Sequence, residues 1–333
     1  MKDGICVAGN LIVDVQYQIE SYPQKSELTT IKNGVLRSTG GAVCNVGIGL
    51  AILDKNLQVY TLGIIGDDAE ADFIEQQLEQ YENIDIRQIK REGTTSFTVV
   101  MNESATKTRT YFQYRGANAK LSEVDFYWEE INTKILHIGY ILLLDALDQP
   151  DEEYGTKLAG VLARAQRKGI KTSIDVVTEV GHRFEKMVPP ALKYTDYCVI
   201  NELEAQEATG KQLRDNEGNL LEANMMEVLQ NLFAMGVSTW AVIHAPEGGY
   251  GMDRDGCYIK RSSISLPEGF IKGTVGAGDA FCSGVLYAAY KDMDLAGAIE
   301  LGIAAASCSL SKEGATEGML PANDAMKIYR LYR

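Results

Sequence analysis

The sequence predicts an α/β fold of three layers, in which helices cover both faces of a mostly parallel central sheet and a small β-sheet forms a lid. Apolar runs of strand length alternate with longer segments of helical period through most of the chain. This alternation favours parallel strands that are buried on both faces. The 333 residues are 45% hydrophobic, which is enough for one large core. We therefore expect a single domain that spans residues 1–333.

The strands and helices of the main sheet follow one another in chain order. The expected strands are Ile5–Ala8, Val59–Ile64, Lys134–Ile138, Ser173–Val177, Tyr197–Ile200 and Trp240–His244. The expected helices are Ala42–Leu53, 69–82, Glu153–Lys168 and Glu222–Met235. Gly169 and Gly236 directly follow the last two helices, and glycine readily adopts the left-handed backbone that ends a helix.

Two β-rich stretches interrupt this alternation in the first half of the chain. Segments of about 16–38 and 95–115 contain the runs TTIKNGVL, FTVVM and TYFQY. Together they predict a small antiparallel sheet that projects from the main domain. Because open α/β sheets bind ligands at the carboxyl ends of their strands, such a sheet is placed to act as a lid. The alternative is a surface hairpin without a function.

Composition excludes several classes of protein. The chain carries 32 basic and 46 acidic residues, a net charge of −14, so its overall field repels nucleic acids and anionic membrane surfaces. No apolar run is long enough to span a bilayer, and the amino terminus lacks the pattern of a secretory leader. The six cysteines form no CxxC pair and no cysteine–histidine cluster along the sequence, which argues against a zinc site and against disulfides. We expect reduced thiols and a cytoplasmic location.

A glycine-rich turn before the last helices carries the strongest chemical signal. In the stretch 272–284, KGTVGAGDAFCSG, small residues at Gly276, Ala277 and Gly278 allow backbone amides to converge at the start of a helix. Unpaired amides and the helix dipole at such a point bind anions. Asp279 lies in the first turn of the same helix, either as a simple capping carboxylate or as a general base beside a bound phosphoryl group.

Two other phosphate-binding motifs are absent. The P-loop pattern fails because Gln212 follows Gly210 and Lys211 where serine or threonine is required. The dinucleotide-binding pattern fails because Gly47 and Gly49 have no third glycine after them. The sequence therefore predicts neither a P-loop protein nor a dinucleotide-binding Rossmann domain.

Several motifs together resemble the ribokinase-like, PfkB-type family of carbohydrate kinases. The run 273–281, GTVGAGDAF, is similar to the carboxyl-terminal signature of that family. Gly9 and Asn10 followed by Asp14, the run STGGAVCN at 38–45 and the tetrad NELE at 201–204 match further elements in the same order. The likeness extends from about residue 4 to residue 320, and it implies the ribokinase-like α/β/α fold.

The resemblance implies a role for individual residues. Asp279 would be the general base, and the amides at Gly276, Ala277 and Gly278 would stabilise charge on the γ-phosphate of ATP. The sugar would be held by Asn10, Asp14, Gly40, Gly41 and Asn45. The nucleotide would be held by Asn201, His244, Gly248, Thr274, Gly276 and Gly278. Asn201 and Glu204 would organise Mg²⁺ through its water ligands.

One position departs from the family signature. Gly273 stands where many relatives carry an aspartate that contributes to a monovalent-cation site. The loss of this carboxylate makes activation by potassium doubtful.

The sequence of the lid does not identify the substrate. Arg109 and Arg115 could pair with a carboxylate or phosphate of an acidic sugar, or they could be solvated strand residues. Tyr17, Phe97 and Tyr111 could instead form an aromatic wall for a nucleoside.

These observations predict an ATP- and Mg²⁺-dependent kinase that phosphorylates a hydroxyl of a small sugar or sugar derivative. The alternatives are a nucleoside kinase of the same family, a non-catalytic sugar- or nucleotide-binding sensor, and an NAD-dependent oxidoreductase. Exposed lid strands further predict a homodimer that forms through the lid.

Overall fold

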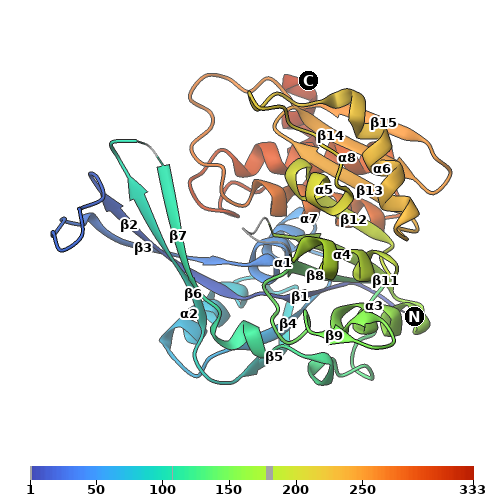
Figure 1. Ribbon diagram of the computed structural model, residues 1–333, viewed down its shortest axis with the longest axis horizontal. Helices are drawn as coiled ribbons and strands as arrows, with labels where there is room; N and C mark the ends of the chain where they lie inside the picture. The colour runs from blue at the N-terminus through green and yellow to red at the C-terminus, as the bar shows by residue number, and fades with distance from the viewer. Residues whose placement is uncertain (1, 107, 178–182) are drawn as a thin grey trace.

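The computed structural model describes residues 2–106, 108–177 and 183–333. Its main sheet has nine strands in the order β15-β14-β13-β12-β11-β8-β1-β4-β5 (Figure 1). The seven strands from β13 to β5 run parallel, and β14 and β15 add an antiparallel edge. The strand bounds are Ile5–Gly9 for β1, Val59–Ile65 for β4, Ile84–Arg91 for β5, Ile135–Ile141 for β8, Lys171–Val176 for β11, Tyr197–Asn201 for β12, Trp240–Ala245 for β13, Gly248–Asp253 for β14 and Tyr258–Ser262 for β15.

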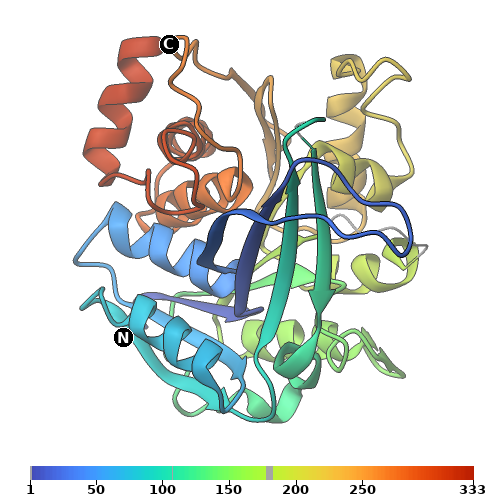
Figure 2. The ribbon, with the colours of Figure 1, turned by 90° about the vertical axis from the view of Figure 1, so that its left-hand side faces the viewer.

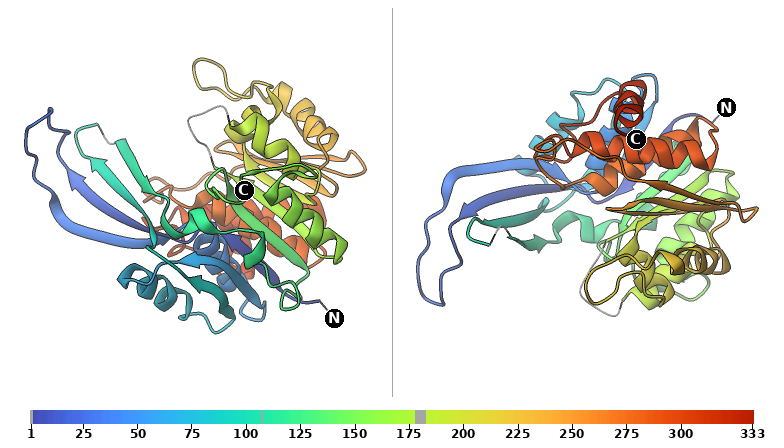
Figure 3. Two further views of the ribbon diagram at one scale, coloured as in Figure 1. Left: turned by 60° about the horizontal axis from the view of Figure 1, so that its bottom comes forward. Right: turned by 90° about the horizontal axis from the view of Figure 1, so that it is seen from above.

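Helices cover both faces of this sheet, as the alternation along the sequence predicted. One face carries α3 (Lys157–Arg167), α4 (Phe184–Leu192), α5 (Glu202–Thr209) and α6 (Met225–Ala234). The other carries α1 (Ala42–Leu53), α2 (Ala69–Leu78), α7 (Ala277–Tyr290), α8 (Leu295–Ser309) and α9 (Ala322–Tyr332). Figure 3 shows the two layers on either side of the strands in the view from above.

Strand β1 shows how the sequence produces two cores. Side chains alternate along a strand, so Ile5 and Val7 pack with the α1 and α7 layer, whereas Cys6 and Ala8 pack with the α3 and α6 layer. A strand that is buried on both faces must be apolar at every position, and for this reason the parallel strands were recognisable as continuous apolar runs.

The lid is a separate four-stranded sheet in the order β3-β2-β6-β7. Its strands are β2 (Ile12–Ile19), β3 (Lys32–Gly40), β6 (Ser96–Glu103) and β7 (Thr108–Tyr114). It projects from the body in Figure 1, and in Figure 2 it lies across the front with the blue and red helices on one side and the green and yellow helices on the other.

The prediction that the lid is antiparallel was wrong for its central pair. β2 pairs with β3 and β6 with β7 in antiparallel fashion, but β2 and β6 are parallel. The reason lies in the main sheet. β2 follows the carboxyl end of β1, and β6 follows the carboxyl end of β5; these ends lie at one edge, so both strands leave the body in the same direction. The lid also begins at Ile12, four residues earlier than the predicted boundary.

Three helix boundaries also differ from the expectations by three or four residues, and the ends of α3 and α6 differ by one. α3 begins at Lys157 instead of Glu153, because the short hairpin β9 (Pro150–Asp151) and β10 (Gly155–Thr156) occupies the preceding residues and Thr156 caps the helix. The predicted helix from Glu222 begins as the 3₁₀ turn η3 (Glu222–Asn224), and α2 ends at Leu78. Two further 3₁₀ turns, η1 (Gly116–Lys120) and η2 (Glu123–Asp125), follow the lid. Gly169 and Gly236 have φ angles of +69° and +124°, as expected for residues that end helices.

Within the described residues, no helix combines the length and the apolar character needed to cross a membrane.

Candidate active site

Asp279 lies in the first turn of α7, near the carboxyl ends of the parallel strands, and only 7% of it is exposed. Its carboxylate accepts hydrogen bonds from two side chains that are distant in sequence. The Asn45 amide donates to Oδ2 at 2.9 Å, and the Tyr140 hydroxyl donates to Oδ2 at 3.0 Å and to Oδ1 at 3.2 Å. These contacts hold the carboxylate in one orientation.

The buried Asp279 interacts with two further carboxylates, the buried Asp175 and the partly buried Asp14, which affects their ionisation. Burial raises the pKa of Asp279, and the hydrogen bonds from Asn45 and Tyr140 oppose that rise. Burial raises the pKa of Asp14 to about 6, opposed by a hydrogen bond from Thr98 and supported by the charge of Asp279. Burial and the charge of Asp279 also raise the pKa of Asp175. Burial and mutual repulsion thus favour the protonated form at these carboxylates.

The amino terminus of α7 leaves backbone amides available beside Asp279. Gly276 is the N-cap residue with a φ angle of +74°, and no side chain caps the helix. The first amide of the regular helical pattern belongs to Ala280, which donates to the Gly276 carbonyl at 2.8 Å, while the Ala277 amide donates only a long hydrogen bond of 3.5 Å to the Thr274 carbonyl. The preceding amides therefore point out of the helix end, where they can bind an anion.

The glycines of this turn are required by close neighbours. A Cβ atom at Gly276 would lie 2.4 Å from the Cβ of Ala315, and a Cβ atom at Gly278 would lie 3.1 Å from the His244 ring. The chain therefore has no room for a larger residue at Gly276, and a larger residue at Gly278 requires the His244 ring to shift by a few tenths of an ångström.

A cleft of about 300 Å³ opens beside this turn. It brings together most of the residues that were predicted for catalysis, metal and nucleotide. Its lining includes Asn201, Glu204, His244, Thr274, Gly276, Ala277, Gly278 and Asp279, together with Tyr140, Asp175 and Cys282.

A second cavity of about 440 Å³ adjoins the turn on the side of α8. Predicted residues His244, Gly248 and Thr274 line it, and most of the remaining wall is apolar, including Ile264, Leu266, Ile271, Phe281, Ile303 and Leu310. The His244 and Phe281 rings lie 5.1 Å apart, and burial lowers the pKa of His244 to about 4, so its imidazole is neutral at pH 7. An apolar pocket of this kind suits a flat heterocyclic base.

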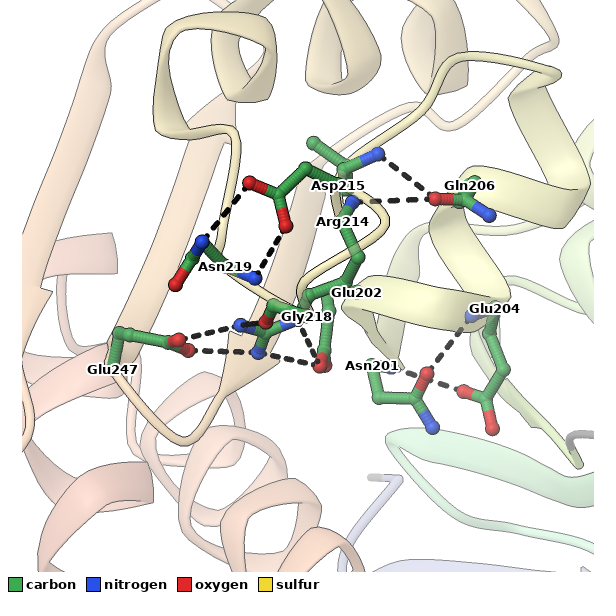
Figure 4. Close-up of polar contacts among 10 residues, drawn as sticks. Asn201, Glu202, Glu204, Gln206, Arg214, Asp215, Gly218, Asn219 and Glu247 are labelled. Carbon is green, nitrogen blue, oxygen red and sulfur yellow. Dashed lines mark hydrogen bonds and ion pairs between the residues drawn. The ribbon is translucent and has the colours of Figure 1, made fainter.

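Asn201 and Glu204 are fixed against each other at the start of α5 (Figure 4). The Asn201 side chain accepts a hydrogen bond from the Glu204 amide at 2.8 Å, and a Glu204 carboxylate oxygen accepts one from the Asn201 amide at 3.0 Å. This capping box holds both side chains rigid at the edge of the cleft. Their oxygen atoms are hard donors of the type that Mg²⁺ and its water ligands prefer, so the residues present fit a magnesium ion.

An ion-pair cluster beside this pair braces the neighbouring turn. Arg214 contacts Glu202 at the start of α5 and Glu247 in the turn between β13 and β14, at 2.7 Å and 2.8 Å (Figure 4). Glu202 lines the second cavity and Glu247 lies between Pro246 and Gly248 of its lining, so this cluster ties two of its walls together.

On the lid side, Asp14 and Asn45 approach Asp279 from different elements. The side-chain amide of Asn45, on α1, donates a hydrogen bond to Asp279. Its side-chain oxygen Oδ1 is buried and has no hydrogen-bond partner in the described part of the chain. An unpaired buried acceptor is unfavourable, so this atom fits a ligand hydroxyl. Asp14 on β2 packs against Gly40, where a Cβ atom would lie 2.5 Å from its Oδ2.

Gly41 and Asn10 pack closely against each other beside these residues. Gly41 caps α1 with a φ angle of +83°, and a Cβ atom there would lie 2.4 Å from the Asn10 carbonyl oxygen. Asn10 is buried, and its side-chain amide is 3.4 Å from the Tyr140 carbonyl oxygen.

The two lid arginines lie far apart. Arg109 pairs with Asn102 toward the outer end of β7, whereas Arg115 follows the inner end of that strand. Six residues of a strand span about 20 Å, so Arg109 and Arg115 cannot bind one small anionic group together. Arg109 lines a hollow of about 320 Å³ between the lid and Lys272.

The lid has one mostly polar and one mostly apolar face, with Leu36 and Val100 on the first and Arg37 and Thr110 on the second. Pairing places Asp14, Thr98 and Gln113 on the same face, and Gln16, Gln18, Asn102, Arg109 and Tyr111 follow by alternation. The opposite face carries Tyr17, Val35, Phe97, Val99, Met101, Phe112 and Tyr114. Of the three aromatic residues that were considered for a nucleoside, only Tyr111 is on the face of Asp14.

Tyr140 and Asp175 belong to the site but were not predicted. Tyr140 lies near the end of β8 with a φ angle of +61°, and its backbone amide donates to Asp175 Oδ1 at 2.6 Å. Asp175 lies near the end of β11, and a carboxylate at the carboxyl end of a predicted parallel strand was the signal that could have found it. No comparable signal marks Tyr140, because its contact with Asp279 spans 139 residues.

Gly273 occupies a position where no side chain fits. A Cβ atom there would lie 2.9 Å from the Glu313 carbonyl oxygen and 3.0 Å from that of Lys312. An aspartate cannot replace Gly273 unless the backbone at Lys312 and Glu313 moves. This chain therefore lacks, at this position, the carboxylate that many relatives were expected to contribute to a monovalent-cation site.

Comparison with known proteins identifies the family. The profile of the pfkB family carbohydrate kinases matches residues 2–323. The chain belongs to this family. A 5-dehydro-2-deoxygluconokinase of Bacillus velezensis is 24% identical over 97% of this chain and 93% of that protein. A nucleoside kinase of Methanocaldococcus jannaschii is 23% identical over 94% and 92%.

Solved structures confirm the ribokinase-like fold. The ribokinase of Arabidopsis thaliana, in complex with ribose and ATP, superposes with a TM-score of 0.81 at 20% identity and covers 99% of both chains. A ribokinase from Thermotoga maritima has a TM-score of 0.77 at 17% identity and the same coverage. This pfkB family member is therefore a carbohydrate kinase, a phosphotransferase with an alcohol group as acceptor, as the motifs predicted.

Proposed function

We propose that this kinase transfers the γ-phosphate of ATP to a hydroxyl of a small sugar or sugar acid, with Asp279 as the general base. The observation that carries the proposal is the single turn in which a buried, oriented carboxylate adjoins the uncapped amides of α7. A phosphoryl transfer needs both groups within reach of one oxygen atom.

Asp279 accepts the proton of the substrate hydroxyl as that oxygen attacks. The hydrogen bonds from Asn45 and Tyr140 stabilise the charged carboxylate and oppose the rise that burial causes in the pKa of Asp279, which favours its role as a base. The amides of Ala277 and Gly278 stabilise negative charge on the transferred group, and the closed surroundings strengthen this interaction.

The nucleotide occupies the adjoining cavity in this proposal. His244, Gly248 and the apolar wall hold the base, and Thr274, Gly276 and Gly278 approach the phosphates. Asn201 and Glu204 hold Mg²⁺ through water, and bound Mg·ATP supplies the phosphoryl group with its charge partly neutralised. Gly273 itself offers no side-chain carboxylate for a monovalent cation.

The polar face of the lid supports a sugar or sugar acid over a nucleoside. Asp14, Gln16, Gln18 and Asn102 offer hydrogen bonds to several hydroxyl groups, and Arg109 offers one charge for a carboxylate. Tyr17 and Phe97 point away from this face. The relatives that are named 5-dehydro-2-deoxygluconokinase support the same class of substrate.

The apolar face of the lid supports a homodimer. Val35, Phe112 and Tyr114 are about half exposed on this face, and a second lid would cover them. We expect the protein to sediment as a dimer and the Val35→Lys/Phe112→Lys variant as a monomer; a monomeric parent protein would contradict the proposal. A cytoplasmic location suits the six unpaired cysteines.

The test is ADP release with sugars, sugar acids, sugar phosphates and nucleosides as acceptors. We expect Mg²⁺-dependent turnover with a sugar or sugar acid, and a loss of about 10²- to 10⁴-fold in Asp279→Asn with ADP affinity retained. The matched control is Asp294→Asn, because Asp294 is also a carboxylate at a helix start, and asparagine caps a helix equally well. Turnover close to the parent value in Asp279→Asn would refute the general base, and turnover with nucleosides alone would refute the substrate class.

A further inference from the structure

Among the described residues, His137, Asp175 and Cys282 bring three metal-binding side chains together at the edge of the cleft. They come from β8, β11 and α7, all three are buried, and their ligand atoms lie within 4.8 Å of one another. The Nε2 atom of His137 is 4.0 Å from Asp175 Oδ2. The mechanism proposed above uses neither His137 nor Cys282.

His137 provides a second and independent observation. It is completely buried, its Nδ1 lies 3.0 Å from the Ser173 hydroxyl, and its Nε2 has no hydrogen-bond partner among the described residues. When Nδ1 carries the proton and donates it to Ser173, Nε2 presents a bare lone pair, which is the form that binds metals. Burial lowers the pKa of His137 to about 3, so the ring is neutral at physiological pH.

Gly139 lies beside this lone pair and is closely surrounded. A Cβ atom at this position would lie 2.1 Å from the Ala42 Cβ, 3.1 Å from Asp175 Oδ1 and 3.2 Å from His137 Nε2. The close approach of Ala42 therefore requires glycine here, and ligand atoms of His137 and Asp175 both border this position.

We propose that His137, Asp175 and Cys282 bind one Zn²⁺ ion, at a site separate from the oxygen ligands of Mg²⁺. A nitrogen, an oxygen and a sulfur donor together favour zinc, whereas magnesium takes oxygen donors alone. Bonds of about 2.0–2.3 Å place tetrahedral ligands about 3.3–3.8 Å apart, so the three side chains need to close by only a small amount. Asp175 and Cys282 also line the cleft, which leaves the fourth position to water or to a ligand oxygen.

Binding requires the loss of protons. The zinc–sulfur bond forms as the Cys282 thiol releases its proton to solvent, and burial raises the pKa of this thiol. Zinc uptake therefore increases with pH. The sequence shows no zinc motif because the three ligands come from segments that are 38 and 107 residues apart.

Zinc at this site opposes the kinase reaction, a consequence that rests on the proposed function. Tyr140 joins the two sites, since its amide donates to Asp175 and its hydroxyl donates to Asp279. A divalent ion on Asp175 adds positive charge beside the general base and occupies the wall of the phosphate cleft.

The binding test is equilibrium dialysis of the whole purified protein against ZnCl₂, with the bound metal measured by mass spectrometry. We expect one equivalent of zinc, and an affinity that is weaker by at least about tenfold in Cys282→Ala and in Asp175→Asn. Cys308→Ala, which changes an equally buried cysteine of α8, and Cys257→Ser, which removes the exposed thiol, should bind as the parent protein does. Thermal unfolding confirms that each variant is folded.

Cobalt provides a readout of the thiolate itself. We expect Co²⁺ to produce thiolate-to-metal charge-transfer absorption in the parent protein and in Cys308→Ala, and none in Cys282→Ala. Absence of stoichiometric zinc uptake, or equal uptake by the parent protein, Cys282→Ala and Asp175→Asn, would overturn the site. Inhibition is measured separately at saturating Mg²⁺, with each protein compared with its own zinc-free rate. Unchanged turnover in a protein that holds one zinc would refute the inhibition, and the dialysis result stands whether or not the kinase assay finds a substrate.

Discussion

The hydroxyl of Tyr140 provides the sharpest test of how the base is held. It donates to both oxygens of Asp279 at 3.0 Å and 3.2 Å in a buried environment, so it stabilises the charged form of the carboxylate. A hydrogen bond to a charged group contributes about 1.5–3 kcal/mol. Tyr140→Phe removes this bond and keeps the ring and the backbone, and the pKa of Asp279 should rise further above its ordinary value.

The sign follows from the role proposed for Asp279. A general base acts when it is ionised, so activity should be lost as pH falls through the pKa of Asp279, and a higher pKa should move this loss to higher pH. On the acidic limb of the profile, kcat/KM of Tyr140→Phe should be roughly tenfold to a hundredfold below that of the parent protein, whereas on the alkaline plateau the two should converge.

Tyr287→Phe is the matched control. The Tyr287 hydroxyl donates to Asp54 Oδ2 at 3.0 Å from the same helix α7, but Asp54 does not line the cleft. This variant should keep the parent pH profile. If the profiles of Tyr140→Phe and the parent protein superimpose, the hydroxyl does not stabilise the ionised base, and the account of Asp279 is wrong.

Two further predictions concern the other carboxylates. Burial raises the pKa of Asp14 to about 6, so the folded state favours its protonated form, and this contribution to stability is lost as pH rises through about 6. Asp14→Asn should therefore be more stable than the parent protein at pH 8 by at most about 3 kcal/mol, with little difference at pH 4, in thermal unfolding; equal stability at pH 8 would contradict the shift. Glu204→Gln keeps the capping box, because glutamine also serves at this position, and should raise the Mg²⁺ concentration for half-maximal turnover while the unfolding temperature stays unchanged. An unaltered Mg²⁺ requirement would exclude Glu204 from the metal site.

The sequence predicted best those features that depend on residues close together in the chain. Val59–Ile64 and Trp240–His244 were predicted to within one residue at their ends, since a strand buried on both faces is apolar throughout. The start of α3 was misplaced because its helical pattern continues backward into the hairpin β9–β10, where Gly155 and the cap Thr156 decide the boundary. The turn at Gly276–Asp279 was recognisable because anion site and carboxylate are adjacent in the chain.

The amino-acid sequence alone determined the layered fold, the segments of the lid, the glycine-rich turn and the kinase family, because each depends on local periodicity or on a contiguous motif. Tertiary structure alone decided the parallel pairing of β2 with β6, the separation of Arg109 from Arg115, the hold of Tyr140 on Asp279 and the convergence of His137, Asp175 and Cys282. These features depend on the relative direction and register of strands that are distant along the chain. No local pattern encodes them, because chain packing brings together groups whose spacing in the sequence carries no information about their distance in space.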